Sequence, residues 1–139
     1  MSTDDARSKE ELREEIYAEI RNRRGYLLPV HELFGEVDPE ILRRYNDLAS
    51  YLIFSPEPRG LDLKTRFLVM IGVTVATKGD REGIEWSMRR ARELGATEQE
   101  VLEAIALAAL PAGIPAVEYA ARAWKEVQEG KGWVEGGEH

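Results

Sequence analysis

Apolar residues recur along most of the chain at intervals of three and four, and no stretch alternates regularly between apolar and polar side chains. This spacing is typical of helices that bury one face, whereas alternation would indicate strands. The pattern therefore predicts an all-α fold of about six helices. They are expected to begin near Ser8, Pro39, Leu63, Arg81, Glu98 and Pro115.

Capping residues mark several of these helix starts. Ser8 with Glu11, and Thr97 with Glu100, fit the S/T-x-x-E capping box, in which two side chains satisfy free amides of the first turn. The dipeptide Asp38-Pro39 joins a good N-cap acceptor to a residue that suits the first helical position. These signals predict where the helices begin more firmly than where they end.

The segment from Asp62 to Lys78 carries apolar side chains nearly all round, among them Phe67, Ile71 and Val75. A helix without a polar face is buried on most sides. Its β-branched residues would also suit a strand, but its uninterrupted length favours a helix. We expect this segment to be the central buried helix of the fold.

The two helices that follow Thr97 are rich in alanine over residues 104–110 and 116–127. Small side chains allow two helix axes to approach closely. The pattern predicts a tight antiparallel helical hairpin. Core packing is the simpler role for these alanines, and a subunit interface is the alternative for the face that the core does not use.

Length and composition point to one soluble domain over residues 1–139, with a loose glycine-rich tail at 130–139. Hydrophobic residues make up 43% and charged residues 32%, as in ordinary globular proteins. The net charge of −7 argues against a nucleic-acid surface, which needs surplus Lys and Arg. No apolar run approaches the roughly 20 residues of a membrane span, so a cytoplasmic protein is expected.

The chain has no cysteine and only two histidines, His31 and His139. Disulfides, thiolate metal sites and thiol redox chemistry are therefore excluded, and so is a site with several histidine ligands. Asp80, Glu82 and Glu85 could hold a metal only in poor geometry, because the first two do not share a helix face. No metal and no cofactor is expected.

Three motifs occur in a characteristic order: Leu61-Asp-Leu-Lys-Thr-Arg66, the segment Gly95–Ile105, and Ala112-Gly-Ile-Pro-Ala-Val117. Over residues 60–129 this series resembles the carboxymuconolactone decarboxylase family, which includes the AhpD-like alkylhydroperoxidases. Residues 8–54 would then be a helical N-terminal extension. The resemblance implies an AhpD-like helical fold, a pocket near the helix that starts at Arg81, and a homo-oligomer, either trimer or hexamer.

The resemblance does not bring a working catalytic set with it. It places the two cysteines and the histidine of the peroxidase branch at Asp80, Gly83 and Ser87, and that branch's glutamate at Phe67. Because the branch acts through a thiolate, its peroxidase mechanism is excluded here. The cysteine-free decarboxylase branch is closer, since Gly79-Asp-Arg-Glu82 fits its pattern, but its histidine is again Ser87.

The polar residues near this helix start are the predicted site. Ser87 and Glu82 are the predicted catalytic residues, Ser87 as a donor to a developing oxyanion and Glu82 as the source of a proton. Arg89 or Lys64 would supply positive charge. The predicted substrate-binding residues are Phe67, Asp80, Trp86, Arg89 and His31.

Several residues near this helix start also have a simpler structural explanation. Asp80 suits an N-cap, and Glu82 suits the positive end of the helix dipole. Glu85 and Arg89 are spaced for an i, i+4 pair on the surface. Trp86 is one residue off the apolar stripe, which suits either the edge of the core or the wall of a pocket.

His31 is the only imidazole outside the tail, and it precedes the expected helix at Pro39. In this fold class the N-terminal part can cover the pocket, including that of a neighbouring subunit. Two functions remain open: an enzyme acting on a small lactone or carboxylic acid without thiol chemistry, and a non-catalytic oligomeric or ligand-binding relative. A closed apolar core around Phe67, Trp86 and Ser87 would favour the second, and an open cavity with converging Glu and Arg the first.

Overall fold

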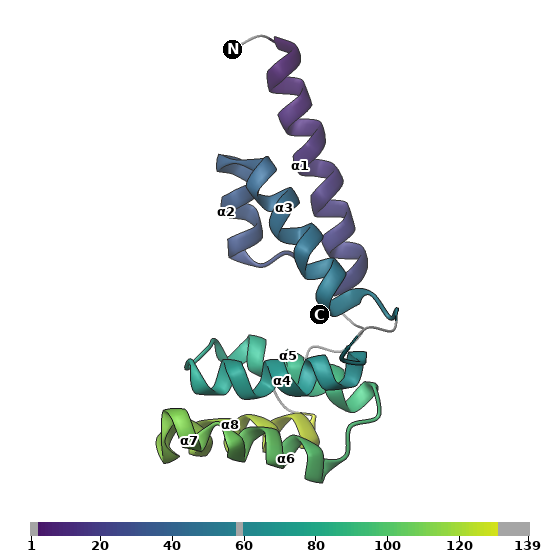
Figure 1. Cartoon of the computed structure of the whole chain (residues 1–139). Helices are drawn as coiled ribbons and strands as arrows, with labels where there is room; N and C mark the ends of the chain where they lie inside the picture. Colours follow the sequence, from purple (N-terminus) through teal and green to yellow (C-terminus); the bar gives the residue numbers. More distant parts are fainter. Residues whose placement is uncertain (1–2, 58–59, 131–139) are drawn as a thin grey trace. The chain divides into compact units, whose positions relative to one another are not determined.

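The structure is a computed structural model that describes residues 3–57 and 60–130 (Figure 1). The described residues are helical, with no strand among them, and so the all-α prediction is confirmed. They fall into two compact units, one ending at Phe54 and the other beginning at Ser55. The predicted single domain over 1–139 stays a prediction, and the predicted loose tail lies outside the described residues except for Gly130.

The N-terminal unit contains α1 (Thr3–Arg24), α2 (Pro29–Val37), α3 (Pro39–Ala49) and a short π-helix, η1 (Ser50–Phe54). Its core is formed by Ile16, Tyr17, Ile20 and Leu42. The structure corrects two expectations here. Helix α1 begins at Thr3, so Ser8 lies within it and caps nothing, and α2 was not predicted because Gly35 and two flanking prolines disguise a nine-residue helix.

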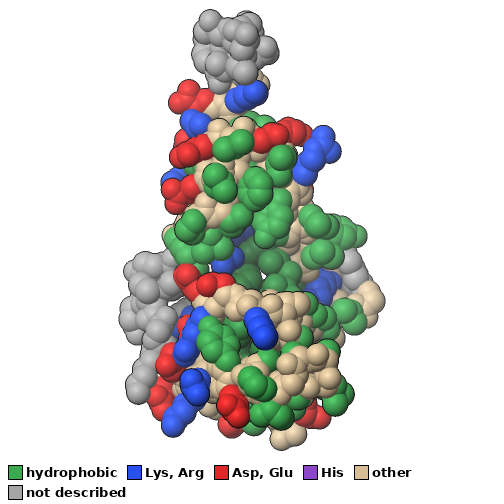
Figure 2. Space-filling view, turned by 90° about the vertical axis from the view of Figure 1, so that its left-hand side faces the viewer, with side chains coloured by type: hydrophobic (Ala, Val, Ile, Leu, Met, Phe, Trp, Pro, Cys, Tyr) green, Lys and Arg blue, Asp and Glu red, His purple; other side chains and the backbone are tan. Residues whose placement is uncertain are grey.

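Helix α3 turns a different face inward from the one its pattern suggests. Asp38 caps it as predicted, with Oδ1 accepting from the amide of Glu40 at 3.1 Å. Its buried residues are Pro39, Leu42 and Asn46. The apolar stripe is exposed instead, and it consists of Ile41, Tyr45, Leu48 and, in η1, Leu52. Figure 2 shows hydrophobic side chains gathered on one face of this unit.

The C-terminal unit contains α4 (Leu63–Ala76), α5 (Arg81–Glu93), α6 (Glu98–Leu107), α7 (Ala109–Ala112) and α8 (Ile114–Glu129). Helices α4 and α5 form one layer and α6, α7 and α8 the other (Figure 1). Helix α4 contacts all four of the others, which confirms its central place. The alanine-rich α8 packs on α5 as well as on α6 and α7, and its Ala120 and Ala123 are fully buried.

Helix α4 is less completely buried than its apolar composition predicts. Phe67, Ile71 and Val75 lie on one face and are fully buried. On another face Val69 is 48% exposed and Val73 is 55% exposed. The expectation of burial on most sides is therefore wrong for this face, because no described element of the unit covers it.

Side-chain caps begin one helix in each layer of this unit. Asp62 accepts from the amide of Thr65 at 2.8 Å and begins α4. Thr97 and Glu100 form the predicted capping box and begin α6: the amide of Glu100 donates to Thr97 Oγ1 at 3.1 Å, and the amide of Thr97 donates to Glu100 Oε1 at 2.9 Å.

Among the described helices none is long and apolar enough to cross a membrane.

Candidate functional site

The turn between α4 and α5 has an unusual backbone. Helix α4 ends in a Schellman motif, in which the amide of Gly79 donates to the carbonyl of Thr74 at 2.7 Å and that of Lys78 donates to Val75 at 3.2 Å. The motif places Lys78, rather than a glycine, in the left-handed region, with φ of 57°. A left-handed conformation costs an ordinary L-residue about 1–2 kcal/mol, and such outliers cluster at functional sites.

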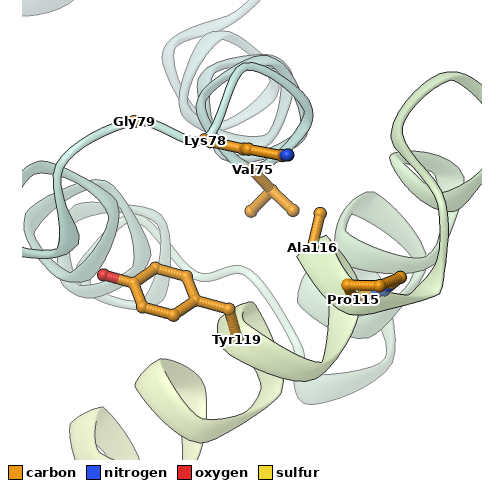
Figure 3. Close-up of a pocket in the computed structure, with 6 residues that line it drawn as sticks. All are labelled: Val75, Lys78, Gly79, Pro115, Ala116 and Tyr119. Carbon is orange, nitrogen blue, oxygen red and sulfur yellow. The ribbon is translucent and has the colours of Figure 1, made fainter.

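Lys78 and Gly79 open onto a cavity of about 260 Å³. Val75 of α4, with Pro115, Ala116 and Tyr119 of α8, completes its lining. Figure 3 shows the Lys78 side chain extended over Val75 towards Ala116, with the ring of Tyr119 across the cavity. The lining is thus mostly apolar, with one ammonium and one phenol at its edge.

Two cationic residues, Lys78 and Arg81, lie beside the cavity, and only Arg81 is held in ion pairs with described residues. Arg81 is bound to Glu85, with 3.0 Å between Nε and Oε1, and to Glu126, with 2.5 Å between Nη2 and Oε2. Its guanidinium also lies 5.6 Å from the centre of the Tyr119 ring. The hydrogen bond to Glu85, together with the charge of Glu126, raises the pKa of Arg81. Lys78, by contrast, has no hydrogen-bond or ion-pair partner among the described residues.

The first turn of α8 adds a second positive feature. Gly113 takes the N-cap position with φ of 88°, and Pro115 follows in the first turn. The amide groups at a helix N-terminus carry partial positive charge and bind anions. Ala116, in this first turn, lines the cavity. The cavity therefore combines an apolar body with positive potential at one side, which suits a small carboxylate.

Three of the predicted site residues lie inside the C-terminal unit. Phe67, Trp86 and Ser87 are all buried, and Ser87 is only 1% exposed. The rings of Phe67 and Trp86 meet edge to face, with centroids 5.4 Å apart. None of the three lines the cavity at Lys78. Glu85 and Arg89 of α5 are buried as well, so this part of the helix buries charged side chains too.

The predicted catalytic pair does not come together on α5. Glu82 is exposed in the first turn, whereas Ser87 is buried one and a half turns later. At 100° per residue the two side chains leave the helix about 140° apart. Asp80 takes the N-cap position as expected, but its side chain makes no capping hydrogen bond.

The surface pair expected between Glu85 and Arg89 is wrong. Both residues are buried, and Glu85 binds Arg81, one turn earlier, instead. Lys64, the other predicted cation, binds Glu100 at 3.0 Å and so supports the start of α6. No group of three or more potential metal ligands occurs in the described part of the chain.

His31 belongs to the N-terminal unit and is only 7% exposed. Its Nδ1 accepts a hydrogen bond from the amide of Leu28 at 3.0 Å. Burial, and secondarily the charge of Arg24, lower its pKa from 6.5 to about 4. The imidazole is therefore neutral near pH 7 rather than poised to exchange protons there.

Sequence reasoning missed Lys78, Pro115, Ala116 and Tyr119 as cavity residues. At this turn it is Lys78, and not Gly79, that takes the left-handed conformation. The cavity adjoins the turn that leads into α5, but none of the predicted site residues is among those that line it. A surface lysine and a solvent-edge tyrosine give no periodic signal that would have identified them.

The described helices define an all-α protein with the fold of the carboxymuconolactone decarboxylase proteins. The model of the carboxymuconolactone decarboxylase family matches residues 39–126, well over half of the chain. The chain belongs to this family. An uncharacterized protein of Methanocaldococcus jannaschii is 33% identical over 88 residues, which cover 60% of this chain and 84% of that protein.

Two crystal structures are similar to this one. A candidate carboxymuconolactone decarboxylase of Burkholderia xenovorans has a TM-score of 0.70 at 20% identity, over 88% of this chain and 95% of that one. A carboxymuconolactone decarboxylase family protein of Legionella pneumophila has a TM-score of 0.59 at 25% identity, over 84% and 95%. The first likeness, at this identity, shows the fold alone. The family resemblance of the sequence is confirmed, including the absence of the cysteine pair.

Proposed function

We propose that this chain is a thiol-independent member of its family that binds a small carboxylic acid or lactone in the cavity between α4 and α8. The observation that carries the proposal is Lys78, a strained cation without an ion-pair partner among the described residues, at the edge of a mostly apolar cavity. Apolar pockets with a few well-placed polar groups are the usual form of small-molecule sites. A cytoplasmic location goes with this proposal as a prediction.

A panel of small lactones, oxo-acids and aromatic acids tests the binding in a thermal-shift experiment. A ligand at about ten times its Kd adds roughly 1.4 kcal/mol. That corresponds to a rise in Tm of about 2–6 °C for a chain of this size. Lys78→Met should remove the shift, and Lys125→Met, an exposed lysine on the same unit, should keep it. An unshifted Tm across the panel would contradict the proposal.

A decarboxylase is the second candidate function, and Lys78 favours it too. In that reaction the bond to the carboxylate carbon breaks and carbon dioxide leaves. The electron pair passes into a conjugated carbonyl, and a proton is then added to carbon. The Lys78 ammonium would stabilise the developing oxyanion, and the Tyr119 hydroxyl or water would return the proton. Ser87 and Glu82 stay as the predicted alternatives for these two roles.

Turnover separates the two candidates. An unsaturated lactone that carries a carboxylate is incubated with the protein, and carbon dioxide release is measured beside ligand binding. Binding without release supports the ligand-binding function. Release that falls in Lys78→Met and Tyr119→Phe supports a decarboxylase at this cavity, whereas loss only in Ser87→Ala and Glu82→Gln would move the site to α5.

We further propose that the chain self-associates through the open side of α4 and α6. A groove of about 360 Å³ lies there, lined by Leu68, Val69, Gly72, Ala104 and Leu107 with Glu100 and Glu103 at its edge. Leu107 is 64% exposed, and Val73, one helical turn along α4 from Val69, is also exposed. Contiguous apolar surface of this kind is typical of protein interfaces. A trimer or hexamer is the expected assembly.

A further inference from the structure

Two exposed apolar surfaces of this chain have opposite shapes. The groove between α4 and α6, of about 360 Å³, is a hollow lined by Leu68, Val69, Gly72, Ala104 and Leu107. Its volume is comparable with that of pockets that enclose whole small molecules, so several side chains of a partner can enter it. The self-association proposed above does not say which surface fills this groove.

A second copy of the groove is a poor partner for the groove itself. In a two-fold contact a surface meets its own copy, and here one hollow would face another. A trimer, moreover, has no two-fold axis, and its subunits meet through two different surfaces of the chain. The expected occupant of the groove is therefore a convex apolar surface elsewhere on the chain.

Helix α3 supplies a surface of this kind. Ile41, Tyr45 and Leu48 recur at intervals of four and three, so they form one line along the helix, which we call the α3 ridge. These residues are 47%, 53% and 59% exposed. Helix α2, which packs on α3, exposes three more large side chains, Val30, Leu33 and Val37. Together the six expose on the order of 600 Å², close to the roughly 800 Å² that each partner buries in a standard interface.

The edge of the groove carries a carboxylate without a partner. Two glutamates of α6 lie there, Glu100 and Glu103. Glu100 is bound to Lys64 at 3.0 Å and also accepts from the amide of Thr97 at 2.9 Å. Glu103 has no hydrogen-bond or ion-pair partner among the described residues. The groove therefore offers negative charge to a partner that brings a cation.

The α3 ridge is bordered by an exposed cation. Arg44 lies three residues after Ile41 and four before Leu48, and residues at these spacings are neighbours on a helix surface. Its guanidinium pairs with Glu40, with 3.2 Å between Nη2 and Oε1, and both side chains are exposed. Exposed pairs of this kind contribute little to stability, so Arg44 can exchange Glu40 for a carboxylate of another chain.

We propose that the α3 ridge of one copy of this chain fills the groove between α4 and α6 of the next copy, with Arg44 beside Glu103 at the groove's edge. The proposal rests on the self-association proposed above and names the surface that fills the groove. Each copy then offers one ridge and one groove. Contacts of this head-to-tail kind close into a ring when the rotation between copies allows it, as a trimer requires.

Two variants of the full chain, each defective in one surface, test this pairing. Leu48→Glu places a charge in the ridge and leaves the groove intact, and Leu107→Glu does the reverse. Both positions are more than half exposed, so neither change should unfold the chain. Sedimentation velocity at about 100 μM should show each variant alone near 15.7 kDa and an equimolar mixture near twice that mass.

The mixture should recover one contact because the groove of the Leu48→Glu chain still accepts the ridge of the Leu107→Glu chain. Asn22→Glu is the matched control, since it adds the same charge at an exposed position of α1. This variant should assemble as the unaltered chain does.

Charge reversal tests the pair at the edge of the groove. Arg44→Glu and Glu103→Arg should each raise the dissociation constant of the assembly at least about threefold, because each places like charges side by side. The double variant restores opposite charges and should return to within about twofold of the unaltered chain. Effects that simply multiply in the double variant overturn the placement of Arg44 beside Glu103.

The measured masses separate this proposal from the more general one. If groove meets groove, Leu48→Glu assembles as the unaltered chain does, and if ridge meets ridge, Leu107→Glu does. Either result, or a mixture that stays at 15.7 kDa, overturns the pairing of ridge with groove and leaves self-association standing. An unaltered chain that is monomeric at about 100 μM overturns both proposals and leaves the groove to a different protein. None of these results bears on ligand binding at Lys78.

Discussion

Lys78 holds a left-handed backbone that glycine would adopt at no steric cost. Lys78→Gly should therefore raise the free energy of unfolding by about 0.5–1 kcal/mol, since part of the relief is lost to the greater freedom of glycine in the unfolded chain. The same change should abolish the ligand-induced rise in Tm. Urea unfolding with and without ligand measures both effects. A destabilised variant that still binds would show that this lysine has a purely structural role.

Ser87 is packed inside the C-terminal unit and does not line the cavity at Lys78. Ser87→Leu should overpack the core and lower the free energy of unfolding by about 1–3 kcal/mol. Ser87→Ala should change it by less. Chemical denaturation of both variants gives the comparison, and a neutral Ser87→Leu would mean that the side chain faces open space.

At the level of single residues, sequence reasoning succeeded for groups whose role is local. Asp38, Asp62 and Thr97 cap their helices because the acceptor and its amide partners lie within three residues. It failed for Glu85 and Lys78, whose roles depend on which helix lies opposite. Glu85 has two arginines at helical spacing, and only the packing of α8 against α5 determines that Arg81 is its partner.

The capping box of α6 gives a test at the scale of one element. Thr97→Ala removes the oxygen that accepts from the amide of Glu100 and should cost about 1 kcal/mol. Thr97→Ser keeps that oxygen and should restore most of the loss. Equal unfolding midpoints for the alanine variant and the unaltered chain would contradict the assigned cap.

Helix α2 makes stability depend on pH through His31. Its pKa is about 4 in the folded chain and 6.5 in an unfolded one, so the unfolded chain binds more protons between these values. The contribution of His31 to the free energy of unfolding should be fully present above about pH 6.5. It should fall by roughly 1–2 kcal/mol towards pH 4.5, after allowance for solvent screening. Unfolding by urea at pH 7 and pH 4.5 measures the difference.

His31→Gln should flatten this dependence between pH 6.5 and 4.5. At lower pH a further loss is expected, because hydrogen bonds from the amides of Thr65 and Thr97 hold the pKa values of Asp62 and Glu100 below their ordinary range. That second loss should remain in His31→Gln. An unchanged slope in this variant would show that His31 does not cause the first one.

Helical periodicity predicted which segments are helices but not which apolar face is buried. On α3 the stripe from Ile41 to Leu52 is regular and yet exposed, because Pro39, Leu42 and Asn46 face α1 and α2. On α4 both faces are apolar, so the pattern could not say which one the unit covers. A sequence shows that a helix carries more apolar surface than one buried face needs, but it does not show which surface covers the excess.

At the scale of the whole molecule, the exposed side of α4 and α6 predicts self-association. Light scattering after size exclusion should give a mass several times 15.7 kDa. Val73→Glu should reduce that mass, because it buries a charge in the interface. Gln128→Glu adds the same charge at the exposed end of α8 and should leave the assembly intact. A monomer at micromolar concentration would contradict the proposed interface.

The location of the ligand is the central claim, and an NMR titration tests it most directly. Isotope-labelled protein is titrated with the acid that gives the largest rise in Tm. We expect saturable shifts of the amides of Gly79, Ala116 and Tyr119. In Lys78→Met the same shifts should titrate with a Kd about 10–100-fold weaker. Shifts centred on Trp86 and Ser87, or equal binding by Lys78→Met, would contradict a site at Lys78.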